Sequence, residues 1–278
     1  MAKSIYPCLW FDGKAKSAAD FYRSAFSNSK IISENPMVLI FEINGKKIMA
    51  LNGGPEYKIN PAISFFVHCI SVKEIDQLWK RLSDEGKTLM ALNEYPWSKR
   101  YGWVQDKFGM TWQLMLNEES GAKQSLVPSF LFTAAQFGKA EEAIGFYSSL
   151  FENSKTEGMT HYPKEDANAG KVLFSEFYLN NYLLIAMDGP GVHEYSFDEG
   201  VSFVIECENQ KEIDFYWDAF TKDGKEGKCG WCKDKFGVSW QVIPAILGKL
   251  MSDPEKAPKV MYAFMQMKKF DIEKLIKM

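Results

Sequence analysis

Cys229 and Cys232 stand three positions apart, the spacing of a redox pair or of half a zinc site. A redox pair needs the first turn of a helix to lower the thiol pKa, and zinc needs two further ligands. The residues around this pair read as a strand, in which positions three apart face opposite sides. The two thiols are therefore either a small reactive site or two unrelated strand residues.

An internal repeat bears on this choice. Three blocks occur twice in the same order, and they are residues 21–30 and 146–155, 64–79 and 202–217, and 102–113 and 230–241. The last block has the pattern Gly-Trp-x-x-Asp-Lys-Phe-Gly-x-x-Trp-Gln in both copies, but Tyr101 and Val104 stand where the second copy has cysteines. The chain is thus a duplicated domain, and the thiol pair is not part of what was duplicated.

The three histidines do not form a ligand set. His68 lies near a predicted strand end and its counterpart in the repeat is Glu206, while His161 and His193 lie in predicted loops. We find no glycine-rich strand-to-helix turn, no G-x-S-x-G, no H-E-x-x-H and no P-loop. We therefore expect no bound cofactor, and the sequence identifies no catalytic residue.

Apolar patterns place these residues on strands and helices. Residues 6–11, 37–43, 47–51, 62–69, 100–105 and 110–116 have strand character, and residues 14–26 have a helical period. Asn44-Gly45 is a strong hairpin signal. Ser71 and Glu74 form a capping box for a second helix, and Gly86 stands where that helix should end.

Each half of the chain therefore predicts two βαβββ units, which makes an α+β protein with mixed sheets. We expect domains at 1–120 and 121–248, joined by a polar linker at 117–124, and a helical extension at 249–278. In the extension Val260, Phe264 and Met267 recur at helical spacing. This methionine-rich face should pack on the body, although it could instead dock a partner.

Composition limits the classes of function. The 278 residues carry a net charge of −3 without a basic stripe, so nothing favours nucleic-acid binding. No apolar run is long enough to span a membrane, and the first five residues do not resemble a signal peptide. Five cysteines, an odd number, read as reduced thiols. A soluble cytoplasmic protein is the expectation.

Several motifs together resemble a known family. They are Leu9-Trp-Phe-Asp-Gly13 followed by Phe21-Tyr22, the break at Leu51-Asn-Gly-Gly-Pro55, and the repeated Gly-Trp block. They resemble the PhnB-like branch of the vicinal oxygen chelate superfamily, commonly labelled 3-demethylubiquinone 3-methyltransferase-like. The superfamily also contains glyoxalase I, extradiol dioxygenases, and fosfomycin- and bleomycin-resistance proteins. The resemblance covers residues 5–116 and 126–245.

The resemblance implies a fold and an arrangement of domains. Paired βαβββ units curl into an open sheet around a small-molecule cavity. In glyoxalase-type members the first unit of one domain completes a cavity with the second unit of the other. We therefore expect an intramolecular pseudo-dimer with two non-identical cavities, and leave open whether two chains form a homodimer.

The resemblance also implies four places for metal ligands, normally His, Glu or Gln. They fall near Pro7, Ala50, Ala62 and Gln113 in the first domain and near Pro128, Ala186, Gly200 and Gln241 in the second. A shift of one residue would bring in Cys8, Met49, Leu51 or Ile63 instead. Only the glutamines could coordinate, so we expect no metal, and glyoxalase, dioxygenase or fosfomycin-type chemistry is disfavoured.

Strand alternation predicts which side chains line the cavities. The candidate ligand-binding residues are Asn52, Ser64, Phe66, Thr111, Gln113, Asp188, Ser202, Ser239 and Gln241. Alternation places Leu9, Phe11, Met115, Phe130 and Val204 on the same faces. The apolar members could equally pack a core, and each glutamine could pin neighbouring strands. Since Asn52 corresponds to Asp188, the two cavities should differ in charge.

Two functions fit these observations. The first is a metal-independent small-molecule binding protein, like the drug-binding members of the superfamily; no acidic cluster for a cationic drug is visible in the sequence. The second is an enzyme, either methyltransferase-like or an isomerase or lyase with a metal held through Gln113 or Gln241. The sequence does not name the ligand.

Overall fold

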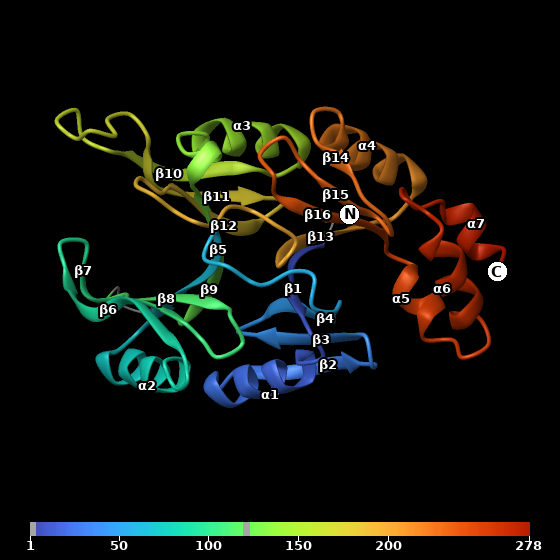
Figure 1. Ribbon diagram of the computed structural model, residues 1–278, viewed down its shortest axis with the longest axis horizontal. Helices are drawn as coiled ribbons and strands as arrows, with labels where there is room; N and C mark the ends of the chain where they lie inside the picture. Colours follow the sequence, from blue (N-terminus) through green and yellow to red (C-terminus); the bar gives the residue numbers. More distant parts are fainter. Residues whose placement is uncertain (1–3, 119–122) are drawn as a thin grey trace.

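The computed structural model describes residues 4–118 and 123–278, and four βαβββ units follow one another along it (Figure 1). Unit one consists of β1 (Ile5–Phe11), α1 (Ala15–Ala25), β2 (Ser29–Glu34), β3 (Val38–Ile43) and β4 (Lys46–Asn52). Unit two consists of β5 (Ile63–Cys69), α2 (Val72–Leu82), β6 (Lys87–Tyr95), β7 (Ser98–Gln105) and β8 (Thr111–Leu116). The predicted strand and helix positions in this half are confirmed.

The second half repeats this order and adds a helical tail. Unit three consists of β9 (Ser125–Phe132), a 3-10 turn (Ala134–Gln136), α3 (Ala140–Leu150), β10 (Lys155–His161), β11 (Val172–Leu179) and β12 (Tyr182–Asp188). Unit four consists of β13 (Val201–Cys207), α4 (Gln210–Thr221), β14 (Lys225–Glu226), β15 (Trp231–Lys233) and β16 (Ser239–Pro244). The tail contains α5 (Leu247–Met251), α6 (Ala257–Met265) and α7 (Ile272–Ile276). Residues 119–122 of the predicted linker lie outside the described residues.

The units pair across the two halves of the chain. Sheet A has the order β14-β15-β16-β13-β1-β4-β3-β2, and sheet B has the order β10-β11-β12-β9-β5-β8-β7-β6. Sheet A therefore joins units four and one through the antiparallel pair β13 and β1, while sheet B joins units three and two through β9 and β5. The predicted pseudo-dimer, in which each half contributes to both sheets, is confirmed.

Local chemistry explains the ends of the two later helices. The Ser71 hydroxyl accepts a hydrogen bond from the Glu74 amide, and Asn209 accepts one from the Glu212 amide. At the other end, a Cβ on Gly224 would lie 2.0 Å from the Lys233 carbonyl oxygen. Only glycine permits this close approach of the backbone.

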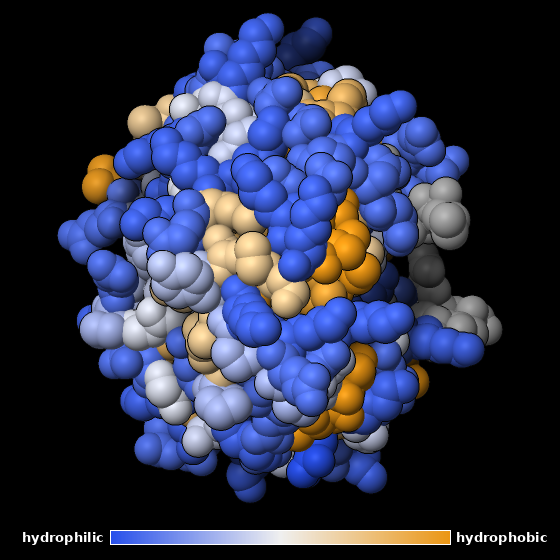
Figure 2. All heavy atoms as spheres, turned by 90° about the vertical axis from the view of Figure 1, so that its right-hand side faces the viewer, coloured by the Kyte–Doolittle hydropathy of each residue, from blue (hydrophilic) through white to orange (hydrophobic). Residues whose placement is uncertain are grey.

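The tail packs back on unit four, as its pattern predicts. Val260, Phe270 and Leu275 are buried in the main hydrophobic core, and Phe264 and Met267 pack against it. Figure 2 views the side on which α5–α7 lie and shows hydrophobic side chains near the centre of a mostly hydrophilic face. No helix among the described residues is long and apolar enough to cross a membrane.

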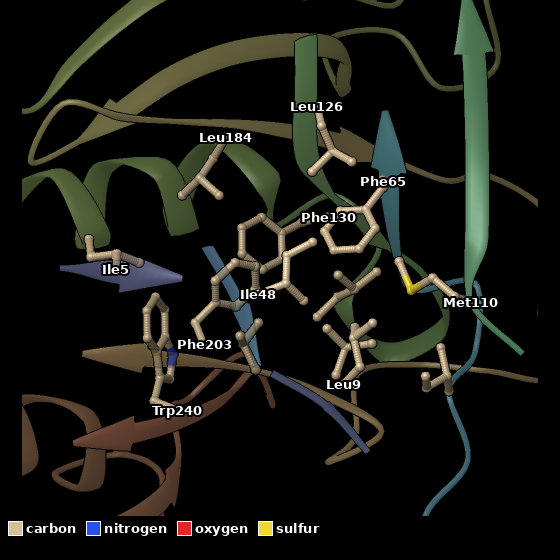
Figure 3. Packing of buried hydrophobic residues seen from close by; sticks show 14 of the residues in the cluster. Ile5, Leu9, Ile48, Phe65, Met110, Leu126, Phe130, Leu184, Phe203 and Trp240 are labelled. Atoms are coloured by element: carbon tan, nitrogen blue, oxygen red, sulfur yellow. The ribbon is translucent and has the colours of Figure 1, made fainter. Parts of the chain in front are cut away.

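The main core is shared by all four units. Phe65 and Phe130 from sheet B and Phe203 and Trp240 from sheet A point toward the same interior (Figure 3). The rings of Phe130 and Phe203 lie 4.9 Å apart. One core therefore holds both sheets and their helices, and each sheet keeps its opposite face for other side chains.

Candidate ligand-binding site

Each sheet carries a second, smaller cluster on the face that does not contribute to the main core. We call these surfaces face A, on sheet A, and face B, on sheet B. Face A contains Tyr6, Cys8 and Val204, against which Met49, Leu51 and Ile243 pack. Face B contains Phe66, Tyr101, Val127 and Ile185, against which pack Met90, Tyr95, Trp103, Met115, Phe174, Leu183 and Met187.

A chain of buried hydrogen bonds crosses face B. The Tyr101 hydroxyl donates to Gln113 Oε1 at 2.6 Å, and Gln113 Nε2 donates to the Ser64 hydroxyl at 2.8 Å. Burial raises the pKa of Tyr101, so this phenol keeps its proton at neutral pH. Ser129 stands opposite Ser64 in the β5–β9 ladder, and its buried hydroxyl has no hydrogen-bond partner among the described residues. The buried hydroxyl of Thr111, on the same face, also has no partner among the described residues, so face B carries two unpaired buried hydroxyls beside a satisfied polar chain.

Aromatic rings lead from this polar chain to the surface. The Phe66 ring centre lies 6.2 Å from that of Tyr101 and 5.9 Å from that of Phe174. At the tip of the β6–β7 hairpin, Tyr95 and Trp97 stack with ring centres 5.0 Å apart, and the Trp97 side chain is 58% exposed. A half-exposed tryptophan that stacks on a neighbour is well placed to cover a flat ligand.

A pocket of about 740 Å³ opens beside the outer rings of this series. Tyr95, Trp97, Phe174, Met115 and His68 line it. Its volume lies within the ~300–1,000 Å³ that is typical of small-molecule sites.

Three carboxylates gather at the rim of this pocket. Glu94, Glu118 and Glu176 line it, whereas Lys99 is the single lysine or arginine among its lining residues and pairs with Glu118 at 2.9 Å. The three glutamates come from different parts of the chain. The sequence shows no acidic cluster because these carboxylates meet only in the folded chain.

Face A has a different centre. Gln241 Nε2 donates to the Ser202 hydroxyl at 2.9 Å, as Gln113 does to Ser64. Cys8 takes the place of Ser129, and burial raises the pKa of its thiol to about 12 although Gln241 and Ser202 hydrogen-bond to it. Such a thiol is inert at neutral pH.

One end of face A is closed by charged and aromatic groups. Glu206 Oε1 accepts hydrogen bonds from the Tyr6 hydroxyl at 2.7 Å and from Lys47 Nζ at 2.6 Å. Lys47 Nζ also lies 3.9 Å from the Tyr6 ring centre. The corresponding position of Glu206 on face B is His68, which lines the open pocket. The two faces are therefore not equivalent sites.

The tail replaces part of a hairpin beside face A. In unit two, residues 87–100 link Gly86 to Tyr101. In unit four, only residues 225–228 link the equivalent positions, Gly224 and Cys229. The backbone amides of Cys229 and Gly230 donate instead to the carbonyl groups of Met267 and Lys268 at 2.8 and 2.7 Å. The tail thus occupies the position that the ring-bearing hairpin has in unit two.

The structure separates the predicted site residues into three groups. Ser64, Phe66, Thr111 and Gln113 lie on face B, and Ser202, Ser239 and Gln241 lie on face A. Asn52 and Asp188 do not join them. Asn52 Oδ1 accepts from the Ala15 amide at 2.9 Å, and Asp188 Oδ1 accepts from the Gly138 amide at 2.8 Å, so both fix the approach to a helix.

The predicted faces of the first strands are wrong by one residue. Leu9, Phe11 and Phe130 belong to the main core, and their neighbours Cys8 and Ser129 occupy the opposite faces. Both faces of these strands are buried, so the sequence lacks the alternation that would reveal the correct one. Asn52 and Asp188 end β4 and β12 and bind backbone amides beside a helix. The charge difference between cavities that was expected from this pair therefore does not arise.

Metal ligation can be judged from the donor atoms. The central positions are Cys8, Met49, Ser202 and Gln241 on face A and Ser129, Ile185, Ser64 and Gln113 on face B. The resemblance implies His, Glu or Gln ligands, and each face supplies only one glutamine beside hydroxyl, thiol, thioether or aliphatic groups, so these donor sets do not fit a divalent ion. Among the described residues no group of three or more His, Cys, Asp or Glu is placed to hold a metal ion.

The cysteine pair is not a redox motif in this fold. Cys232 is buried on β15, while Cys229 precedes that strand and is partly exposed. Both thiols are free, and burial raises the pKa of each. Neither lies on the first turn of a helix, so nothing activates them.

Sequence reasoning missed the residues that form the pocket itself. Tyr95, Trp97 and Glu94 lie at a hairpin tip, and Phe174 and Glu176 come from unit three. The aromatic residues between Glu94 and Tyr101 are absent from the second copy, and this difference between the copies was the available signal.

Comparisons with known proteins agree with this architecture. The family described as 3-demethylubiquinone-9 3-methyltransferase matches residues 3–115 and 124–243. A PhnB protein from Bacillus cereus, described as a candidate 3-demethylubiquinone-9 3-methyltransferase, is 35% identical; the match covers 40% of this chain and 98% of that protein, with a TM-score of 0.38. Glyoxalase I from Zea mays is 14% identical over 91% of this chain and 97% of its own, with a TM-score of 0.59. No curated protein matches.

Proposed function

Because the chain belongs to the 3-demethylubiquinone-9 3-methyltransferase family of the vicinal oxygen chelate superfamily, we propose that it is a metal-independent small-molecule binding protein whose site is the pocket on face B. The observation that carries this proposal is the pocket of about 740 Å³ whose lining includes the rings of Tyr95, Trp97 and Phe174. Aromatic rings beside polar and charged groups give such a pocket both contact area and groups that orient a ligand.

The rim favours a ligand with a flat ring and a positive charge. Trp97 and Tyr95 offer ring faces, and the carboxylates of Glu94 and Glu176 supply negative charge close by. Aromatic faces attract cations as well as other rings.

Isothermal titration of the full chain with 1-naphthylmethylammonium tests the proposal. We expect binding that Trp97→Ala weakens about three- to tenfold, because an aromatic contact is worth ~0.5–1.5 kcal/mol. Glu94→Gln together with Glu176→Gln should weaken it further and reduce its dependence on salt. Phe215→Ala, which removes another half-exposed ring on α4, is the matched control and should change nothing. No binding, or binding that Trp97→Ala leaves intact, would overturn the proposal.

Methyl transfer is the second candidate, and the family's description favours it. Methyltransferases usually hold S-adenosylmethionine at a glycine-rich turn between a strand and a helix of a parallel sheet. Here the break at Gly53 and Gly54 connects β4 to β5, both in mixed sheets, and no helix follows it. A rise in melting temperature with S-adenosylmethionine would support methyl transfer, and no shift at saturating concentration would count against it.

A further inference from the structure

A second cavity, of about 560 Å³, lies between units one and two and shares no lining residue with the pocket on face B. It is bounded by the end of β1, the segment 55–59 that follows β4, and the turns before β6 and β8. We call it the lysine groove. Residues far apart in the sequence meet here, and none of the proposed functions uses them.

An aromatic pair with a fixed geometry forms one side of the lysine groove. Trp10 Nε1 donates to the Gly54 carbonyl oxygen at 2.8 Å, and the Trp10 and Tyr57 rings meet edge to face at 5.1 Å. A Cβ on Gly53 would lie 2.3 Å from the Trp10 ring, so only glycine lets the chain pass this close. The indole is therefore held in place, with Tyr57 beside it at the groove.

Cationic side chains surround this aromatic pair. Lys14, Lys58 and Lys87 line the groove, and none has a carboxylate within 4.0 Å among the described residues. Lys107 also lines it but is paired with Glu85 at 2.8 Å. The unpaired lysines come from three different elements, so their charges meet only in the folded chain.

The carboxylates of the groove do not cancel this charge. Glu85 is occupied by Lys107. Asp106 is buried and turned inward, where it accepts hydrogen bonds from Trp112 Nε1 at 2.7 Å and from two backbone amides. Asp12 is the remaining carboxylate of the lining against three unpaired lysines. Outside the lining, Glu56, Asp198 and Glu199 act on Tyr57, and Glu199 is paired with Lys233 at 2.8 Å. The four lysines of the lining outnumber its three carboxylates, so the lysine groove has a small excess of positive charge, while the rim on face B has an excess of negative charge.

We propose that the lysine groove is a second ligand site, which takes a small aromatic anion such as an aromatic carboxylate or phosphate monoester. The ring of the ligand lies against Tyr57 and Trp10, and its anionic group is held by Lys58 and Lys87 or Lys14. Lysine amines are flexible point charges, so they suit an anionic group of variable shape. This site goes beyond the proposed function because its cavity and its charge are different.

Titration calorimetry with 1-naphthoate tests the site, since this probe has the same ring as 1-naphthylmethylammonium and the opposite charge. We expect naphthoate to bind the full chain, and Lys58→Gln and Lys87→Gln each to weaken it about three- to tenfold. Lys211→Gln, which removes an exposed lysine of α4 that lines neither pocket, is the matched control and should leave naphthoate binding unchanged. These lysines are exposed, so the melting temperature should stay within about 1 °C in every variant.

The two proposals fail separately. If naphthoate does not bind, or binds Lys58→Gln and Lys87→Gln as tightly as the unmodified chain, the lysine groove is not an anion site. If Trp97→Ala abolishes naphthoate binding, the anion occupies face B and the second site is overturned. The binding of the ammonium probe reports on the proposed function in the same variants and is independent of these outcomes.

Discussion

Asp234 and its counterpart Asp106 explain why the repeated Gly-Trp block is so specific. Asp234 Oδ2 accepts from the Tyr147 hydroxyl at 2.6 Å and from Trp240 Nε1 at 2.8 Å, while Oδ1 accepts from the amides of Phe236 and Val238. The carboxylate thus ties a turn, a helix and a strand together inside the core. The duplicated block is a folding element, and functional differences must be sought elsewhere.

The variant Asp234→Asn should be destabilised by about 2 kcal/mol, because an amide NH₂ cannot accept all four hydrogen bonds. Burial raises the pKa of Asp234 to about 6, against the effect of its hydrogen bonds. A folded-state pKa above the unfolded value means that the folded chain holds the proton more tightly, so this contribution to stability grows as the pH falls from about 7 toward 4. Urea unfolding should therefore show a penalty about 1 kcal/mol larger at pH 5 than at pH 7.

Lys235→Gln is the control for this measurement, since its amine bonds to exposed Glu142 and its loss should cost little at either pH. An Asp234→Asn penalty that is the same at both pH values would contradict the raised pKa. An Asp234→Asn variant with the same free energy of unfolding as the unmodified chain would contradict the structural role itself.

The secondary-structure elements were predictable where local chemistry marks them. Asn44 and Gly45 have φ values of 50° and 77° in the turn between β3 and β4, as the hairpin signal predicts. The orientation of β1 and β9 was not predictable, since both of their faces are buried. The pocket on face B was also beyond local reasoning, because it joins a hairpin tip of unit two to strand β11 of unit three.

The tail should contribute to stability because it packs where unit four has a shorter hairpin than unit two. Phe270 is buried, its ring lies 6.0 Å from that of Phe264, and a Cβ on Gly230 would meet it at 2.6 Å. Phe270→Ala should lower the free energy of unfolding by about 3 kcal/mol, because it leaves a cavity beside β15. Ile276→Ala, at a half-exposed position of the same tail, should cost less than about 1 kcal/mol.

Equal stability of these two variants in urea would show that the tail is not part of the folded unit. Because the pocket on face B lies on the other sheet, Phe270→Ala should still bind 1-naphthylmethylammonium at temperatures where it is folded. Loss of that binding in the folded variant would mean that the tail supports face B as well.

At the scale of the whole molecule, the pairing of units makes the two halves interdependent. Sheet A is continuous only through β1 and β13, with Tyr6 opposite Val204 and Cys8 opposite Ser202, and sheet B only through β5 and β9. A half chain alone would leave both of these strands with an unpaired edge and would expose their buried side chains to water. The motifs could predict the four units, whereas the choice of partner came from the resemblance to glyoxalase-type domains.

The interdependence can be tested by dividing the chain within residues 119–122. We expect fragments 1–118 and 123–278, when produced separately, to be unfolded or self-associated, because each sheet lacks half its strands. Produced together they should co-purify as a one-to-one complex that binds 1-naphthylmethylammonium, since the face B pocket takes residues from both fragments. Light scattering after gel filtration measures the assembly, and calorimetry measures the site. Two stable, folded monomers that do not associate would refute the paired arrangement, because β1 and β5 would then need no partner strand from the other half.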